Sequence, residues 1–237
     1  MSIGRIILLI FGILLILGSI PLLVGGGTLL WADMVWTDDD GFIATETDRL
    51  ERDSYAIVTE SADIDIDDEW HWGWGWRGDW DLGDLVTFKV EGSNNDDSKG
   101  IFIGVAQESD LIGYLSDVEY DEIIHFRIHS HGFDVDYKNH SGNSSPTAPA
   151  SETFWMESTS GTGTQVLEWE LETGTYSLVL MNEDGSRDVD LDISVGVKAP
   201  WIFGVGIGFV VGGIVALIVG ILMVISALRG RQRSQPS

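Results

Sequence analysis

Hydrophobic and polar positions divide the chain into two uninterrupted apolar runs and an alternating middle. Ile6–Trp31 contains 26 residues without a charge, and Trp201–Leu228 contains 28. Because a helix needs about 20 apolar residues to cross a hydrocarbon core of about 30 Å, each run predicts a membrane-spanning helix. A cleaved signal peptide is the competing interpretation of the first run. That run exceeds the roughly 7–15 apolar residues of such a peptide, and no A-x-A-like site follows it, which favours an uncleaved anchor.

The middle of the chain alternates between apolar and polar residues with a period of two, which predicts half-buried strands. The segments that show it are Val86–Val90, Ile124–Ile128, Phe133–Tyr137, Leu167–Leu171 and Val189–Val195. Ile101–Ala106 is apolar on both faces, which is typical of a central strand. The glycine-containing turn Asn182–Ser186 predicts a hairpin. Asp110–Leu115 predicts one short helix, capped by Ser109 or by its own first residue.

These elements predict an all-β fold. Roughly eight to ten antiparallel strands with little helix favour a jelly-roll-like sandwich, flanked by N- and C-terminal transmembrane helices. The predicted organisation is a helix at 1–32, a β domain at 33–199, a second helix at 200–228 and a basic tail at 229–237.

Composition adds that the β domain is strongly acidic. The chain has 13 Lys and Arg against 38 Asp and Glu, a formal net charge of −25. All the acidic residues lie between Asp33 and Asp192 with only eight Lys or Arg, so this segment carries −30. The charge excludes a non-specific nucleic-acid binder, which needs a basic face. With four lysines in the whole chain, the acidity indicates a surface solvated in high salt.

The cations outside the domain predict its orientation. Arg5 precedes the first apolar run, and three arginines follow the second, at Arg229, Arg231 and Arg233. Positive residues favour the cytoplasmic side, so both termini are expected in the cytoplasm and the central domain outside the cell. Aromatic residues suit the outer headgroup boundary and stand at both exits, as Trp31, Trp36, Trp201 and Phe203.

Small residues recur along both apolar runs. In the second run every fourth residue is small, giving a stripe of Gly204, Gly208, Gly212, Ala216 and Gly220. In the first run Gly12, Ser19 and Gly26 recur every seven residues. Small residues let helix backbones approach in lipid, so the stripe predicts packing of the two helices or self-association of the second. The alternative is that glycine is simply frequent in membrane helices.

A tryptophan cluster lies before the predicted strand Val86–Val90. It comprises Trp70, Trp72, Trp74, Trp76 and Trp80, and the first four would share one face of an extended ribbon. Indole rings can stack on sugars or cations, or lie at the lipid boundary. The cluster therefore predicts a hairpin tip buried over the sandwich, a protein or glycan surface, or a membrane contact.

Two groups have residue types that bind metals. His125, His129 and His131 share one strand face, and imidazole nitrogens are common zinc ligands. The alternation places them on the solvent face, so the cluster is a weak prediction of a metal site. Asp63–Glu69 is rich in carboxylates but lacks the glycine and distal glutamate of a calcium-binding EF-hand loop. A solvated acidic face is the favoured interpretation there.

Asn139 and Asn143 each begin an N-x-S sequon within the Gly/Ser/Pro-rich loop at 138–151, which predicts glycosylation on an extracellular loop. No nucleophile elbow, phosphate-binding loop or zincin motif occurs in the sequence. The chain has no cysteine, so thiol chemistry and disulfides are excluded. No cofactor is expected.

Part of the chain resembles a group of membrane proteins from actinobacteria and haloarchaea. The similar strings are Gly100–Ala106, Tyr114–Asp121, Thr153–Trp155, Ser160–Gln165 and Val179–Ser186, followed by the C-terminal apolar run. The likeness covers roughly residues 55–225, and the tryptophan cluster and heavier acidity depart from it. The resemblance implies a membrane-tethered β domain and no particular activity. The segment Gly174–Val179 also resembles the closing strands of jelly-roll accessory domains, which is analogy of fold alone.

The sequence therefore predicts a non-enzymatic, two-pass membrane protein that displays a β-sandwich outside the cell and binds a protein, glycan or envelope partner. Two alternatives stay open. One is an extracytoplasmic metal-dependent hydrolase that uses His125, His129 and His131. The other is an accessory subunit, or a homo-oligomer, assembled through the small-residue stripe of the second helix.

Overall fold

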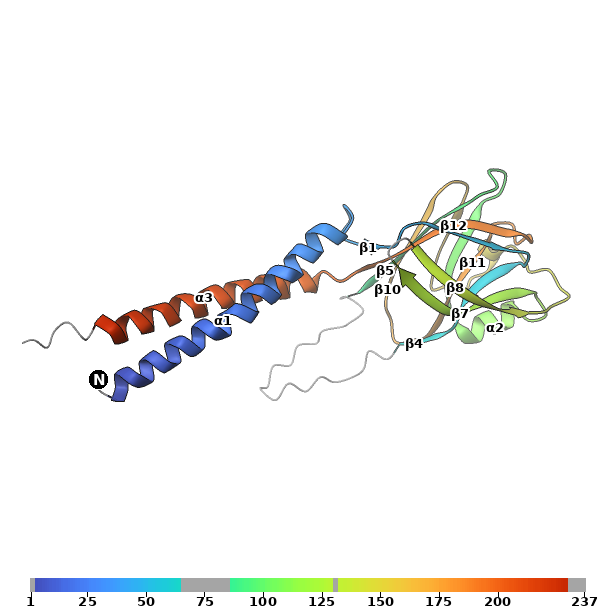
Figure 1. Ribbon diagram of the computed structural model, residues 1–237. Coiled ribbons are helices and arrows are strands. Elements are labelled where there is room, and N and C mark those ends of the chain that lie inside the picture. Colours follow the sequence, from blue (N-terminus) through green and yellow to red (C-terminus); the bar gives the residue numbers. More distant parts are fainter. Residues whose placement is uncertain (1–2, 65–85, 130–131, 230–237) are drawn as a thin grey trace, which may run out of the picture. The chain divides into compact units, whose positions relative to one another are not determined.

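A computed structural model describes residues 3–64, 86–129 and 132–229 of the chain, without the side chains of Ile128 and His129. It forms two units, a helical one made of the segments up to Thr37 and from Pro200, and a β domain at Asp38–Ala199. The helices and strands are labelled in Figure 1.

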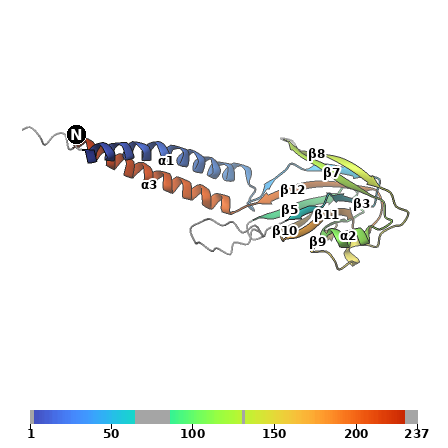
Figure 2. The ribbon, with the colours of Figure 1, turned by 90° about the horizontal axis from the view of Figure 1, so that it is seen from below.

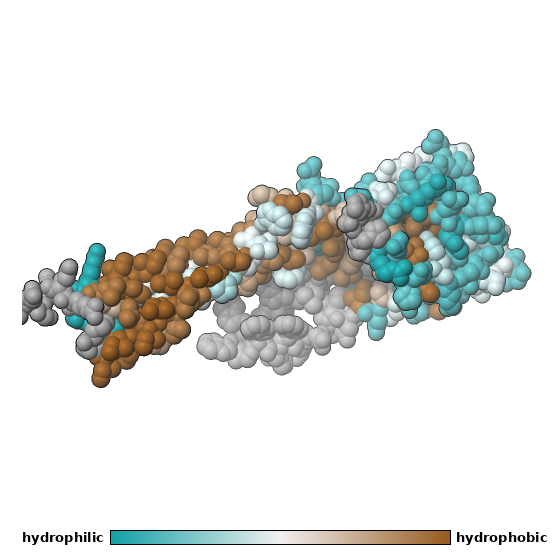
Figure 3. All heavy atoms as spheres, viewed as in Figure 1, coloured by the Kyte–Doolittle hydropathy of each residue, from teal (hydrophilic) through white to brown (hydrophobic). Residues whose placement is uncertain are grey.

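The helical unit contains two helices that are long and apolar enough to cross a membrane, α1 (Ile3–Trp36) and α3 (Trp201–Arg229). Apolar side chains cover both helices on the face seen in Figure 3, whereas the β domain is mostly hydrophilic there. Helix α1 continues past Asp33, four residues beyond the predicted end at 32. Asp33 ends the apolar run, because a charge is unfavourable in a hydrocarbon core, but its side chain does not interrupt the backbone hydrogen bonds of the helix. The helix can therefore be longer than the apolar run.

The two helices pack through small residues spaced seven apart. Gly12, Ser19 and Gly26 are the buried residues of α1. On α3 the buried set is Gly206, Gly213, Gly220 and Ala227. A Cβ on Gly220 would lie 2.8 Å from the Gly12 carbonyl oxygen, and one on Gly26 would lie 2.7 Å from the Gly206 oxygen. Only glycine permits these backbone contacts.

The stripe predicted on the second helix is not the face that contacts α1. Among the described residues, apart from neighbouring residues and nearby backbone of α3 itself, no atom lies within 4 Å of a Cβ built on Gly204, Gly208 or Gly212. Gly220 belongs to both patterns, because positions four and seven apart coincide there. The predicted pairing of the helices is therefore present, but of the stripe's glycines only Gly220 contacts α1, and self-association of the second helix through the stripe stays a prediction.

The β domain is a sandwich, and its described residues form twelve strands in two sheets. The five-stranded sheet contains β1 (Ile43–Ala44), β2 (Asp48–Arg52), β5 (Thr87–Asn94), β10 (Gln165–Glu170) and β12 (Val189–Lys198). The seven-stranded sheet contains β3 (Ala56–Thr59), β4 (Ala62–Ile64), β6 (Ile101–Gln107), β7 (Tyr120–His129), β8 (Gly132–His140), β9 (Glu157–Gly161) and β11 (Gly174–Asn182). Figure 2 shows β7 and β8 at one side of the sandwich and β9 and β10 at the other.

The strand order in the five-stranded sheet is β1-β12-β5-β10, and β2 also pairs with β12. The strand order in the seven-stranded sheet is β8-β7-β3-β11-β6-β9, and β4 also pairs with β11. One neighbouring pair, β3 and β7, is parallel. The expectation of a wholly antiparallel sandwich was wrong for this pair. Alternation reports which face of a strand is buried but not its direction, and the long chain between β3 and β7 provides the crossover that parallel neighbours need.

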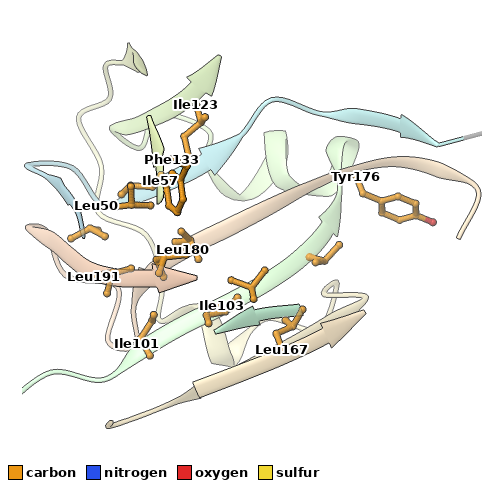
Figure 4. Close-up of a cluster of buried hydrophobic side chains, with 14 residues drawn as sticks. Leu50, Ile57, Ile101, Ile103, Ile123, Phe133, Leu167, Tyr176, Leu180 and Leu191 are labelled. Carbon is orange, nitrogen blue, oxygen red and sulfur yellow. The ribbon is translucent and has the colours of Figure 1, made fainter. Parts of the chain in front are cut away.

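The main core lies between the sheets and follows the predicted alternation. Leu167, Leu191 and Ile193 point into it, together with residues of β6 and β11 (Figure 4). The prediction was wrong for one stretch of β7. A bulge between Ile123 and His125 shifts the register, so Ile123 takes the buried position predicted for Ile124, whereas Phe126 stays on the predicted core face, opposite Val135 and 44% exposed. A bulge shifts the alternation on one side of it relative to the other, which a strict period of two cannot anticipate.

A second apolar cluster covers the opposite face of the seven-stranded sheet. Phe102, Val179 and Met181 of this sheet pack against helix α2 (Glu108–Tyr114) and the loop carrying Phe154 and Trp155. This explains why Ile101–Ala106 is apolar on both faces, as predicted. The helix is present where the sequence predicts it, but its N-cap is Gln107 without a side-chain hydrogen bond, in place of Ser109 or Asp110.

The predicted turn between β11 and β12 is present, but these strands lie in different sheets and do not pair, so the predicted hairpin was wrong and the turn connects the two sheets. The turn is built around Asn182. Its side chain is fully buried, and Nδ2 donates to the carbonyl oxygens of Ser186 and Arg187 at 3.0 and 2.9 Å. Its Oδ1 accepts from Asn94 Nδ2 at 2.8 Å, which ties the turn to β5 of the other sheet. Gly185 takes the positive φ of +72° that the turn requires.

The glycine contact between the helices predicts an outcome for two matched substitutions. In Gly220→Ile the new side chain meets backbone oxygen, so the helices must separate by about 2–4 Å, toward ordinary interaxial distances. Spin labels on Val24→Cys and Val211→Cys, both exposed positions, report the separation in a chain without other cysteines. Gly212→Ile is the control and leaves the distance unchanged. Equal distances in the two variants would contradict this contact.

Candidate functional site

The predicted metal and tryptophan sites fall largely outside the described residues. This holds for the tryptophan cluster (Trp70, Trp72, Trp74, Trp76 and Trp80), for His131 and for the side chain of His129. His125 is described, with its side chain 67% exposed and Nδ1 3.8 Å from Asp136 Oδ2. Among the described residues no group of three or more His, Asp or Glu has the arrangement of a metal site. The metal hypothesis stays a prediction.

The structure brings together a histidine that the sequence analysis did not single out. His140 Nε2 lies 2.7 Å from Glu122 Oε2, and Lys138 Nζ donates to the same oxygen at 3.2 Å. The His140 ring stacks on Tyr120 with centroids 4.4 Å apart and an interplanar angle of 3°. Partial burial alone would raise the pKa of Glu122, but the hydrogen bonds from His140 and Lys138 outweigh it and lower the pKa. The carboxylate is therefore held ionised at neutral pH.

An ion pair with a buried carboxylate lies next to this cluster, on the core side of β7. Asp121, next to Glu122 on β7, points inward and accepts a hydrogen bond from Arg52 Nη2 at 2.9 Å. The Arg52 guanidinium also lies 4.6 Å from the centroid of the Tyr137 ring. Burial would raise the pKa of Asp121, yet the hydrogen bonds and charge of its partners lower it. Because Arg52 belongs to β2 and Asp121 to β7, the pair joins the two sheets.

Aromatic side chains continue from this cluster across the outer face of the seven-stranded sheet. We call Tyr55, Tyr120, His140, Glu122 and Arg187 the aromatic face. The Tyr55 hydroxyl lies 2.9 Å from Ser145 Oγ, and the Arg187 guanidinium lies 5.2 Å from the ring centroid of Tyr55. Arg187 is in turn held by Glu119 at 3.0 Å. Half-exposed rings beside fixed polar groups suit recognition of a polar partner.

The two sequons differ in their surroundings. Asn139 lies within β8 opposite Asp121, and its Nδ2 is 3.3 Å from that buried carboxylate. Asn143 lies in the following loop, where its Nδ2 donates to Asp117 Oδ1 at 3.1 Å. Both amide groups thus have carboxylate partners, and only Asn143 lies in the loop where both were predicted.

A separate cluster joins the first and last residues of the β domain. Phe42 is fully buried, with Lys89 Nζ 4.5 Å and Lys198 Nζ 5.2 Å from its ring centroid. Lys89 Nζ also donates to Asp38 Oδ2 at 2.5 Å. Beside this cluster β1 pairs with the end of β12, Ile43 opposite Val197 and Ala44 opposite Gly196. We call these contacts the base clasp.

Comparison with protein-family models, with curated proteins and with solved structures finds no match to this chain. Function is therefore inferred from the chain's own geometry. The signal that could have found His140 was present, because an aligned β7–β8 hairpin places it near Tyr120 and Glu122. The register needed for that alignment includes the bulge that the sequence pattern hides.

The buried ion pair predicts different costs for two arginines on one strand. Arg52→Met leaves Asp121 buried without its cation and is expected to lower the free energy of unfolding by about 2–3 kcal/mol, less than for a wholly buried pair because Arg52 is partly exposed. Arg49→Met is the control, because its partner Asp190 stays hydrated at the surface. Denaturant unfolding of the full chain in detergent measures both. Equal effects of the two variants would contradict the role of the buried pair.

Proposed function

We propose that this chain is a non-enzymatic integral membrane protein. Its two helices span the membrane with both termini in the cytoplasm, and its β domain binds a protein or glycan partner outside the cell. The observation that carries the proposal is the base clasp. It holds Asp38 and Phe42, which follow α1, together with Lys198, which precedes α3, so the chain enters and leaves the β domain at one end.

Three further features support this proposal. The helices α1 and α3 pair through backbone-to-backbone glycine contacts, as expected for segments that associate in lipid. The cations of the chain's ends favour cytoplasmic termini. The acidity of the domain lies on its solvated faces, which suits a surface exposed to high salt.

The aromatic face is the surface that we assign to the partner. Stacked Tyr120 and His140 provide a flat apolar plane, and Glu122 and Arg187 provide a fixed acceptor and donor beside it. Flat rings with neighbouring hydrogen-bonding groups suit a sugar or an extended polar peptide. The sequons at Asn139 and Asn143 are proposed as glycosylation sites.

An accessory subunit is the second candidate, and one observation favours it. Gly204, Gly208 and Gly212 are unused within the chain, whereas Gly206, Gly213 and Gly220 contact α1. Helix α3 therefore has one small-residue face that is occupied and one that is open. The open face would dock another membrane helix.

The proposed orientation is tested with single cysteines in a chain that has none of its own. Met156→Cys lies on the β domain and Ile3→Cys at the start of α1, and both side chains are exposed. A membrane-impermeant maleimide on intact cells is expected to label Met156→Cys at once and Ile3→Cys only after permeabilisation. The reverse pattern would place the domain in the cytoplasm and overturn the orientation.

Copurification in mild detergent separates the two candidate functions. If the aromatic face binds the partner, His140→Ala is expected to reduce recovery of that partner about tenfold, the loss of one well-placed contact worth about 1.4 kcal/mol. His125→Ala, an exposed histidine on the neighbouring strand, is the control. If α3 docks a partner, Gly208→Ile with Gly212→Ile abolishes recovery instead, and Gly18→Ile on α1 has no effect.

If none of these variants changes the amount of partner recovered, both the aromatic face and the open face of α3 are wrong as binding surfaces. Stoichiometric zinc that survives dialysis of the purified full chain would favour the metal-dependent hydrolase over either of them.

A further inference from the structure

We infer that one row of apolar side chains at the end of the five-stranded sheet rests in the lipid headgroup layer. The inference depends on the proposed membrane anchoring and adds a second, lateral contact of the β domain itself. The row consists of Ile43, Val197, Phe88 and Trp169. These residues stand directly opposite one another across β1, β12, β5 and β10, so their side chains share one face.

The row continues the core beyond the point where the second sheet covers it. The preceding row on the same face, Val195, Val90 and Leu167, packs in the main core. Trp169 is still partly covered, with its ring 5.1 Å from that of Tyr176 on β11. Ile43 and Phe88 are not covered, and they are 43% and 41% exposed. The row is therefore partly covered at Trp169 and Val197 and exposed at Phe88 and Ile43.

Chain connectivity limits the distance between this end of the sheet and the ends of the two helices. Val197 precedes the first residue of α3, Trp201, by four residues, and an extended chain spans at most about 14 Å over that length. Ile43 follows the last residue of α1 by seven residues, a reach of about 25 Å at most. The interfacial layer on each side of a bilayer is about 5–8 Å thick. These limits keep Val197 and Ile43 near the ends of the two helices whatever the angle between the two units, so the row can reach the headgroup layer.

The chemistry of the row fits lipid better than water. Transfer of isoleucine, phenylalanine and tryptophan side chains from water to the interface is favourable, and tryptophan is enriched there. Lys198 follows Val197 directly, as cations do at headgroup phosphates. The domain as a whole carries −28 and is repelled by anionic lipid, so the contact depends on apolar burial and is expected to persist at high salt.

Single-cysteine fluorescence in lipid nanodiscs tests the contact with the full chain. An environment-sensitive fluorophore is attached to Ile43→Cys or to Phe88→Cys, and the nanodiscs contain zwitterionic lipid with a nitroxide on its headgroup. Both positions are expected to show blue-shifted emission and at least twofold quenching, at low salt and at 1 M salt alike. Ile112→Cys on α2, 65% exposed, is the aqueous control. Val215→Cys within α3 reports membrane insertion independently.

Each other pattern has one meaning. If Val215→Cys is shielded from water-borne quenchers but positions 43 and 88 behave as position 112 does, the lipid contact is overturned and the membrane anchoring stands. If Val215→Cys is accessible to water-borne quenchers, the membrane anchoring itself fails. If positions 43 and 88 are blue-shifted but not quenched by the lipid nitroxide, protein covers the row, either a second copy or another segment of this chain, and the inference is again overturned.

Discussion

The structure of the β domain depends on joining its two ends. The chain enters the domain after α1 and leaves it before α3, and these helices pack against each other through glycines. A sandwich between two paired helices must bring its first and last strands together, and β1 does so by pairing with the last residues of β12. Phe42 secures this pairing, because its ring is buried against the side chains of two of the four lysines. Cation–π contacts of this kind are strongest when removed from water.

The scarcity of cations explains much of what else stabilises the fold. Each described Lys and Arg of the β domain has a partner, and most of these pairs join segments distant in the chain. Arg52 joins the two sheets, Arg187 holds the turn before β12 to Asp53 and Glu119, and Lys89 holds Asp38 at the entrance of the domain. The excess acid lies on solvated faces. A domain of charge −28 thus uses its few cations where they connect strands.

Much of the fold could be predicted from the sequence, because apolar periodicity reports burial directly. The two long helices, the strands Leu167–Leu171 and Val189–Val195, the central strand and the turn at Asn182 are present as predicted, but the strands on either side of that turn lie in different sheets and form no hairpin. The parallel β3–β7 pair and the bulge after Ile123 could not be predicted, since both concern strand direction and register. The helix contact was predictable in part. Gly206, Gly213 and Gly220 repeat every seven residues as Gly12, Ser19 and Gly26 do, the period of left-handed helix pairs, but the denser four-residue stripe obscured it.

The candidate site was harder to predict, because it is assembled by contacts between strands. His140 lies one residue past a sequon asparagine and carries no motif of its own, and only the β7–β8 register places it on Glu122 and Tyr120. The predicted histidine cluster was chosen from spacing along a single strand. Spacing within a strand identifies a shared face, whereas a site also requires what the neighbouring strands bring to that face.

The central claim is that the base clasp holds the two ends of the domain together, and hydrogen exchange of the full chain in nanodiscs tests it most directly. The amide of Thr45 donates to Val195 O at 2.8 Å, and that of Val195 lies 3.2 Å from Thr45 Oγ1. These amides are expected to exchange as slowly as those of β12 between Leu191 and Ile193, and faster in Phe42→Ala. Exchange at 42–45 and 195–198 within seconds in the unsubstituted chain would show that the ends are frayed and would contradict the account.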